Sequence, residues 1–189
     1  MTNFTITGKP GSGKGTQATL LANRLGIPHI STGDIFREEM RLGTPLGLAI
    51  TDSMNAGQYT SNEITNAVVE KRLTQLDAAN GFILDGYPRT LNQVEFLDSI
   101  GVRIDAVIDL HIDTEDAVDR LLLRAKSMDR ADDAEEVIRS RMVTYEETVL
   151  PVLAAYEARG TMYRFSAVGK IAEINQHLYN VLQEKLAGS

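Results

Sequence analysis

Two glycines and a lysine near the beginning of the chain have the spacing of a phosphate-binding loop. Gly8, Gly13 and Lys14 fit the pattern G-x-x-x-x-G-K within the stretch GKPGSGKGTQ. Glycines let backbone N–H groups converge on an anion, and a helix that starts after the loop directs its positive end to the same point. A tight strand-to-helix turn would also use glycine and proline. The full spacing favours a nucleotide site, with Lys14 at the terminal phosphates.

The residue after Lys14 departs from this pattern, which has Ser or Thr at that position. This chain has Gly15 there, and the first hydroxyl belongs to Thr16. A hydroxyl displaced by one residue is poorly placed as a direct ligand of Mg²⁺. We therefore expect the nucleotide and water molecules to hold most of the metal ion's coordination sites.

Two acidic residues are candidates for a place near such a metal ion. Asp85 ends the apolar run in GFILDG, and an acid at the end of a strand beside the loop can order the water shell of Mg²⁺. A turn or helix cap is the alternative for Asp85. Asp34, in the stretch STGD, has the same two interpretations, and the residues around it favour neither.

Arginines are concentrated in the second half of the chain. Of the 13 arginines, five lie between Arg120 and Arg141. Arg120 and Arg124 are four residues apart on one predicted helix face, where two cations repel each other unless an anion lies between them. Arg139 has Glu135 one turn earlier, so a helix ion pair explains it. Arg141 has no acidic residue three or four positions away on either side, and we expect its partner elsewhere in the fold.

Composition narrows the classes of function. The 189 residues carry a net charge of −7, which argues against nucleic acid as the main partner. There is no cysteine, and His29, His111 and His177 lack metal-ligand spacing, so we expect no zinc site and interpret the histidines as structural. The start of the chain lacks a signal sequence, and no apolar run is long enough to span a membrane. We expect a cytoplasmic enzyme without a membrane partner.

Apolar runs with strand character alternate with segments of helical periodicity. This alternation is typical of an α/β fold with a parallel sheet and helices on both faces. The strand-like runs are 3–7, 27–30, 81–86, 102–112 and 161–165. In such sheets, ligands bind beyond the carboxyl ends of the strands. Two stretches break the alternation: residues 31–75 have the pattern of consecutive helices, and residues 125–135 are polar and lack periodicity.

Three motifs, GKPGSGKGTQ, HISTGDIFR and DGYPRTLNQ, follow one another in an order that resembles the adenylate kinase family in its form with a short lid. The resemblance extends through DRADDAEEVIRSRM to the last predicted helix. It implies a P-loop NTPase-type, five-stranded parallel sheet with a helical NMP-binding lobe and a short lid. The implied core comprises 1–30, 61–124 and 136–189, the lobe 31–60, and the lid 125–135. The implied reaction is reversible phosphoryl transfer from Mg-ATP to AMP, giving two ADP, and we expect a monomer.

The resemblance also implies the site residues. Those of the ATP site are Gly11, Ser12, Gly13, Lys14, Gly15, Thr16, Arg120, Arg124 and Gly169. Those of the AMP site are Thr32, Arg37, Gln58, Tyr59, Thr60, Gly86, Tyr87, Pro88, Arg89, Gln93, Arg130 and Arg141. The implied catalytic residues are Lys14, Arg89, Arg120, Arg124, Arg130 and Arg141, and Asp85 holds Mg²⁺ through water. No general base is required, because the acceptor phosphate is already ionised at neutral pH.

Gln93 has two competing interpretations. Thr90-x-x-Gln93 is a capping-box signature, which alone would explain the glutamine. The resemblance instead implies that its amide reads the adenine edge, and Thr32 matches an adenine-contacting threonine. Both residues argue against UMP or CMP as the acceptor, and the chain has no N-K-x-D motif that would favour a GTP-dependent switch. Residues 58–60 depart from the family, which usually has an apolar pair there, so we expect polar edges on the AMP pocket.

Overall fold

The structure is a computed structural model that describes residues 2–126 and 134–187. Arg130 and most of the expected lid, 125–135, lie outside the described residues. In the described part of the chain, no helix is long and apolar enough to cross a membrane.

Five strands form one parallel sheet in the order β2-β3-β1-β4-β5. The strands are β1 (Thr2–Thr7), β2 (His29–Ser31), β3 (Gly81–Asp85), β4 (Ala106–His111) and β5 (Met162–Ser166). Each of the five strand-like runs in the sequence overlaps one of these strands. The predicted five-stranded parallel sheet is therefore confirmed.

Helices connect the strands, with a single 3-10 helix before β3. The helices are α1 (Lys14–Leu25), α2 (Thr32–Leu42), α3 (Pro45–Asn55), α4 (Asn62–Leu73), η1 (Leu76–Asn80), α5 (Leu91–Ser99), α6 (Thr114–Ala125), α7 (Glu135–Ala158) and α8 (Ile171–Ala187). Residues 32–80, all of which the structure describes, contain α2, α3, α4 and η1 without a strand. This agrees with the consecutive helices that the sequence predicts there.

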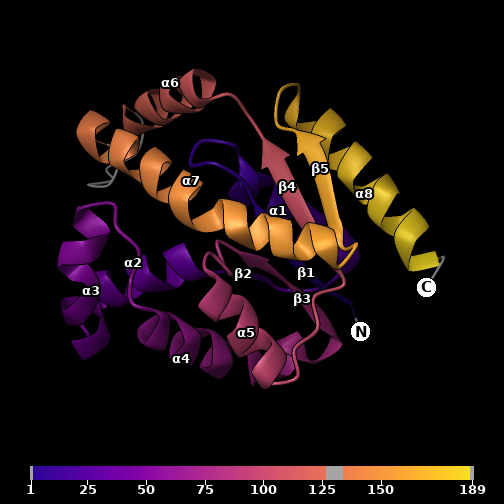
Figure 1. Ribbon diagram of the computed structural model, residues 1–189, viewed down its shortest axis with the longest axis horizontal. Helices are drawn as coiled ribbons and strands as arrows, with labels where there is room; N and C mark the ends of the chain where they lie inside the picture. The colour runs from indigo at the N-terminus through magenta and orange to yellow at the C-terminus, as the bar shows by residue number, and fades with distance from the viewer. Residues whose placement is uncertain (1, 127–133, 188–189) are drawn as a thin grey trace.

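Helices cover both faces of the sheet. Successive side chains of a strand point to opposite faces, so neighbouring residues of β3 show which helices pack on each face. On β3, Ile83 belongs to an apolar cluster with α1, α6 and α8. Its neighbours Phe82 and Leu84 belong to a second cluster with α4, α5 and α7. Figure 1 shows α7 across the front of the sheet and α1 behind it. The sheet is thus a buried middle layer between two groups of helices.

The register of the strands aligns the carboxyl ends of β1, β2 and β3 at the same end of the sheet. Ser31 pairs with Asp85, and Ile6 pairs with Asp85 on the other side of β3. Thr7, at the end of β1, pairs with Asp109 of β4. Because all strands are parallel, the segments after β1, β2 and β3 leave the sheet side by side. These segments contain the phosphate-binding loop, the start of α2 and the stretch 86–90.

Candidate active site

The glycine-rich loop runs from the end of β1 to the start of α1. A Cβ atom at Gly8 would lie 2.5 Å from the carbonyl oxygen of Leu110, so the loop can pack this closely on β4 only with glycine there. Gly13, the residue before α1, has a φ of 83° in the left-handed region that favours glycine. No side chain among the described residues caps this helix end. The first N–H groups of α1 are therefore available to an anion.

The two lysines of the loop have different surroundings. Lys9 Nζ lies 2.6 Å from Thr114 Oγ1 and 2.9 Å from Glu146 Oε1, so Lys9 ties the loop to α6 and α7. Lys14 instead lines the hollow in front of the loop. Of the two, Lys14 is therefore the lysine that faces this hollow, and its role at the phosphates stays a prediction.

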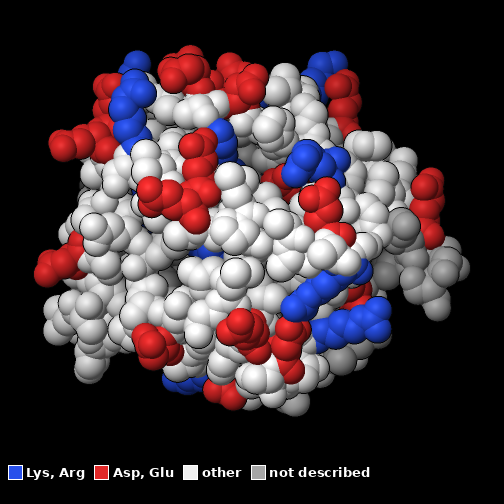
Figure 2. Space-filling model, viewed as in Figure 1, with Lys and Arg blue, Asp and Glu red and all other residues white. Residues whose placement is uncertain are grey.

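A groove in front of the loop gathers positive charge, and we call it the cationic groove. The cations that line it are Lys14, Arg37, Arg89, Arg120, Arg124 and Arg141. The carboxylates that line it are Asp34 and Asp85. On the face of the molecule in Figure 2, basic side chains are scattered among acidic and neutral ones. The groove is therefore a local concentration of cations on a chain with a net charge of −7.

Burial and neighbouring arginines both affect the pKa of Lys14. Loss of hydration on burial is the main cause that lowers it from 10.5 to about 8. Asp85 opposes the shift, whereas Arg89, Arg141 and Arg124 add to it by repulsion. A negatively charged ligand in the groove would attract the ammonium group and so offset both the repulsion and the loss of hydration. The groove is therefore suited to polyphosphate.

Asp85 lies at the end of β3, with only 7% of its surface exposed. Its Oδ2 atom is 3.2 Å from His29 Nε2, and a Cβ at Gly15 would be only 3.4 Å from the same oxygen. The carboxylate therefore faces the phosphate-binding loop, and glycine after Lys14 leaves it room. A carboxylate oxygen beside a phosphate site matches the hard oxygen ligands that Mg²⁺ prefers.

His29 is a groove residue that the sequence analysis interpreted only as structural. Its ring joins Asp85 to α1, because Nδ1 lies 3.2 Å from Thr19 Oγ1. These contacts join residues 10 and 56 positions apart in the chain, and no local spacing signals the second one. His29 belongs to β2, a strand of only three residues that ends at Ser31. It therefore lies within two residues of the carboxyl end where ligands bind, and this is the signal that could have drawn attention to it.

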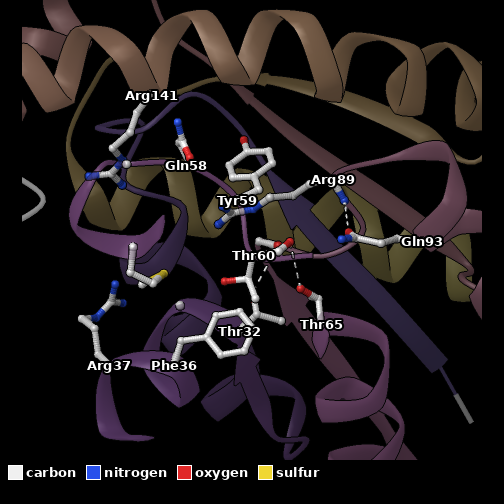
Figure 3. Close-up of a pocket in the computed structure, with 14 residues that line it drawn as sticks. Thr32, Phe36, Arg37, Gln58, Tyr59, Thr60, Thr65, Arg89, Gln93 and Arg141 are labelled. Carbon is white, nitrogen blue, oxygen red and sulfur yellow. Dashed lines mark hydrogen bonds between the residues drawn. The ribbon is translucent and has the colours of Figure 1, made fainter. Parts of the chain in front are cut away.

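A second hollow lies beside the groove, between α2, the segment 57–60 and the end of β3, and we call it the lobe pocket (Figure 3). Its lining includes Thr32, Phe36, Arg37, Met54, Gln58, Tyr59, Thr60, Thr65, Gly86, Arg89, Gln93 and Arg141. Arg37, Arg89 and Arg141 also line the cationic groove. The two hollows therefore meet at these three arginines.

Gln93 is almost fully buried in the wall of the lobe pocket, with 2% of its surface exposed. Its Oε1 atom accepts a hydrogen bond from the Arg89 backbone N–H at 2.7 Å, and its Nε2 donates to Asn62 Oδ1 at 3.0 Å. Thr90 caps α5, since its Oγ1 accepts from the Gln93 backbone N–H at 3.3 Å. The Gln93 side chain therefore accepts its hydrogen bond from the backbone of Arg89, one residue before the N-cap residue Thr90. In a capping box it would accept from the backbone N–H of the N-cap residue itself. One amide hydrogen and one lone pair remain for a ligand.

Asn62 is a second residue that the sequence analysis did not single out. Its Oδ1 atom accepts from both Thr90 Oγ1, at 2.9 Å, and Gln93 Nε2. The bond from Gln93 Nε2 to Asn62 and the bond from the Arg89 N–H to Gln93 Oε1 together fix the orientation of the Gln93 amide. Asn62 begins α4, and it lies 31 residues from Gln93 in the chain, so only the folded structure reveals the contact.

Three buried threonines line the lobe pocket, and their hydroxyl groups differ in their hydrogen bonds. Thr32 Oγ1 donates to the Gly86 carbonyl oxygen at 3.2 Å and is thereby satisfied. Thr60 is 8% exposed, and its Oγ1 has no hydrogen-bond partner among the described residues. Thr65 donates to backbone carbonyl groups at the start of its own helix. The Thr60 hydroxyl is hidden from the pocket, so it does not supply the polar edge expected from the sequence.

Tyr87 and Pro88 are buried between Gly86 and Arg89, which line the lobe pocket. Tyr87 is buried, and its hydroxyl donates to Asn66 Oδ1 at 2.7 Å. Burial raises the pKa of this tyrosine well above its usual value. Pro88 is buried too, after a cis peptide bond. The backbone of this stretch directs Arg89 toward the hollows.

The remaining arginines differ in their partners. Arg37 forms an ion pair with Asp34, which lies three residues earlier in the first turn of α2. Arg139 pairs with Glu135 at 3.1 Å, so the predicted helix ion pair is confirmed. Arg120 Nη2 donates to the Ala167 carbonyl oxygen at 3.0 Å, in the turn before α8.

Gly169 lies two residues beyond Ala167 in this turn. Its φ of 135° is in the range that favours glycine. The contact with Arg120 brings the turn to α6, next to the cationic groove. In the phosphate-binding loop, the side chain of Ser12 is buried. Thr16, at the start of α1, is exposed and lines the cationic groove.

Comparison with known proteins agrees with this geometry. The family model described as adenylate kinase matches residues 6–161. The chain is 45% identical over 184 residues to an adenylate kinase of Thermobifida fusca, covering 95% of this chain and 97% of the relative. It is 47% identical over 177 residues to an adenylate kinase of Stenotrophomonas maltophilia, covering 92% and 95%. An adenylate kinase of a Nocardioides species is 45% identical over 181 residues, covering 94% and 95%.

Proposed function

Since the chain belongs to the adenylate kinase family, we propose that it catalyses the reversible, Mg²⁺-dependent transfer of a phosphoryl group from ATP to AMP, giving two ADP. As a member of that family it is a nucleoside monophosphate kinase. The proposal concerns the acceptor, the metal ion, the residues that act and the way in which they act.

The observation that carries the proposal is the meeting of two hollows at three arginines. The cationic groove starts at the phosphate-binding loop, and the lobe pocket ends at a buried amide, that of Gln93. Arg37, Arg89 and Arg141 line both. This arrangement suits two nucleotides whose phosphates face each other, with ATP in the groove and AMP in the lobe pocket. Arginine is well suited to this junction, since its planar fork binds phosphate oxygens two at a time.

In the proposed reaction an oxygen of the AMP phosphate attacks the terminal phosphorus of ATP. A bond forms between that oxygen and phosphorus, and the bond from the phosphorus to the bridging oxygen of ADP breaks. Lys14 and the arginines hold both nucleotides in line and spread the negative charge of the transferred group. The acceptor phosphate is ionised at neutral pH, so no side chain has to remove a proton.

Asp85 is the residue proposed to hold Mg²⁺ through water. Its buried carboxylate faces the loop between His29 and Gly15, and the donor set of carboxylate, water and phosphate oxygens fits this ion. When bound with the nucleotide, the ion supplies positive charge that neutralises the phosphates. Gly15 leaves space there but offers no hydroxyl to the metal.

Selection of AMP is proposed to depend on Thr32 and Gln93. The Gln93 amide keeps one donor and one acceptor position, which complement the edge of adenine that carries an amino group and a ring nitrogen. Gly169 is proposed to border the adenine of ATP through its backbone. Residues 31–60 and the lid, 125–135, are the proposed moving parts, which close to keep water from the transferred group. Arg130 acts within that lid, outside the described residues.

The test is to mix the purified protein with Mg-ADP and to measure the appearance of ATP and AMP. Replacing AMP by UMP or CMP in the forward direction should give a much lower rate. Arg89→Ala should lower the rate by roughly 10³-fold or more. Arg139→Ala is the matched control, since the partner of Arg139 among the described residues is Glu135, on the exposed surface of α7. This variant should stay within about twofold of the wild type. Near wild-type ADP formation by Arg89→Ala would contradict the assignment.

A further inference from the structure

Tyr59 packs against Arg89. The guanidinium carbon of Arg89 lies 4.5 Å from the centre of the Tyr59 ring, and Figure 3 shows the ring directly beside this side chain. Tyr59 belongs to the stretch 58–60, where this sequence departs from the usual family pattern of apolar residues. From this departure the sequence predicts only a polar edge on the pocket. In the structure, the ring acts on an arginine.

The guanidinium of Arg89 is held on more than one side. A Cβ at Gly86 would come within 2.5 Å of Arg89 Nη2, so the head group lies against a bare glycine backbone. The Arg89 backbone N–H is fixed by Gln93 Oε1. The Tyr59 ring completes the enclosure. Without it, the long and flexible arginine side chain would have space to turn away from the phosphate position.

The kind of contact matters for a phosphate-binding arginine. A guanidinium that lies over an aromatic ring is attracted through its face, and its N–H donors point outward along its edges. The stacked arginine can therefore keep its ring contact and still bind phosphate oxygens. An ion pair with a carboxylate would instead compete with phosphate for the same N–H groups.

Tyr59 also stands where three parts of the site meet. It lines a small hollow together with Lys14 of the loop, Arg89, and Tyr145 and Val149 of α7. Tyr59 lies between α3 and α4, in the segment 31–60 that is proposed to move. The ring therefore links the position of that segment to the position of Arg89.

We propose that Tyr59 is a positioning residue, whose aromatic ring holds the Arg89 guanidinium in the orientation that binds the acceptor phosphate. This inference rests on the proposed function, in which Arg89 binds AMP. The ring carries the effect, and the hydroxyl does not. Tyr59→Leu should lower kcat/KM for AMP about five- to tenfold, and Tyr59→Phe should keep at least about half of the wild-type value. KM for ATP should change by less than about twofold in both variants.

The experiment combines these variants with a control and with Arg89→Ala. Tyr179→Leu is the matched control, because Tyr179 makes the same kind of contact, with Arg24 at 3.8 Å, between α8 and α1. It should leave kcat/KM within about twofold. In the Arg89→Ala background, adding Tyr59→Leu should change the remaining activity by less than about twofold, because the ring then has no guanidinium to hold.

Three results would overturn the inference. They are an unchanged kcat/KM in Tyr59→Leu, an equal loss in Tyr59→Phe, and a further five- to tenfold loss when Tyr59→Leu is added to Arg89→Ala. Thermal unfolding of each variant identifies a loss that is due to unfolded protein, and activities are compared per folded molecule. Failure of the wild-type protein to make ATP and AMP from Mg-ADP would refute the proposed function itself, which is a different result from an active Tyr59→Leu.

Discussion

Lys14 destabilises the ligand-free protein, and replacing it should raise stability while abolishing activity. Its pKa is lowered from 10.5 to about 8, mainly because burial removes water from the ammonium group. This lowering of the pKa corresponds to roughly 3 kcal/mol against the charged form. Lys14 keeps partial contact with solvent, so we expect about 1–2 kcal/mol in practice. Lys14→Met retains a similar length without the charge and should recover that amount.

The pH dependence has a definite sign. Between pH 8 and 10.5 the unfolded chain binds a proton at Lys14 that the folded protein has released, so this group makes stability rise with pH in that window. Below pH 8 its full cost is present. The variant should therefore exceed the wild type most at pH 7, and the difference should shrink as the pH approaches 10. Above pH 10, Tyr156, whose pKa is raised to about 12 by burial, lowers stability in both proteins.

Thermal unfolding without nucleotide, at several pH values, measures this difference. For a chain of this length, 1–2 kcal/mol corresponds to an increase in Tm of about 2–8 °C at pH 7. Adding a bisubstrate analogue with two adenosines joined through five phosphates should reverse the order, since only the wild type binds it strongly. A lower Tm for ligand-free Lys14→Met at pH 7, or a difference that does not shrink toward pH 10, would refute the reasoning.

Three further substitutions test single contacts of the site. Thr60→Val should raise the free energy of unfolding of the ligand-free protein by about 1 kcal/mol, because it removes a buried hydroxyl without a partner among the described residues. Urea unfolding measures this change, and a clear loss of stability would show that the hydroxyl is satisfied. Asn62→Ala should raise KM for AMP about five- to tenfold and leave KM for ATP unchanged, since Asn62 orients the Gln93 amide; equal changes in both constants would argue for general damage. Asp85→Asn should raise the Mg²⁺ concentration for half-maximal rate by about tenfold or more, and an unchanged metal dependence would exclude Asp85 as its partner.

Local patterns in the sequence predict those features that depend on neighbouring residues. The five strands follow from short apolar runs between turn residues, and the phosphate-binding loop follows from the spacing of Gly8, Gly13 and Lys14. The pair of Arg139 with Glu135 follows from one helical turn. In each case, the residues involved lie within a few positions of one another, so the chain geometry alone brings them together.

Contacts between distant segments were not predictable in the same way. His29 reaches Asp85 across 56 positions, and Asn62 reaches Gln93 across 31. The Tyr59 ring meets Arg89 only because the segment before α4 crosses the end of β3. Periodicity reports which face of an element is buried but not which element lies opposite. The resemblance to a family implied which residues belong to the site, Tyr59 among them, but it gave neither of these two pairs nor the contact of the Tyr59 ring with Arg89.

The charge distribution connects binding with stability throughout the site. Six cations and two carboxylates line the cationic groove, an excess of four positive charges (6 − 2) in a chain whose net charge is −7. Burial, together with repulsion from Arg89, Arg141 and Arg124, lowers the pKa of Lys14, so the ligand-free protein bears an electrostatic cost at neutral pH. A pair of nucleotides facing each other brings enough negative charge to remove this cost. The same residues that make the empty groove unfavourable therefore strengthen binding, and substitutions that stabilise the free protein at these positions should weaken catalysis.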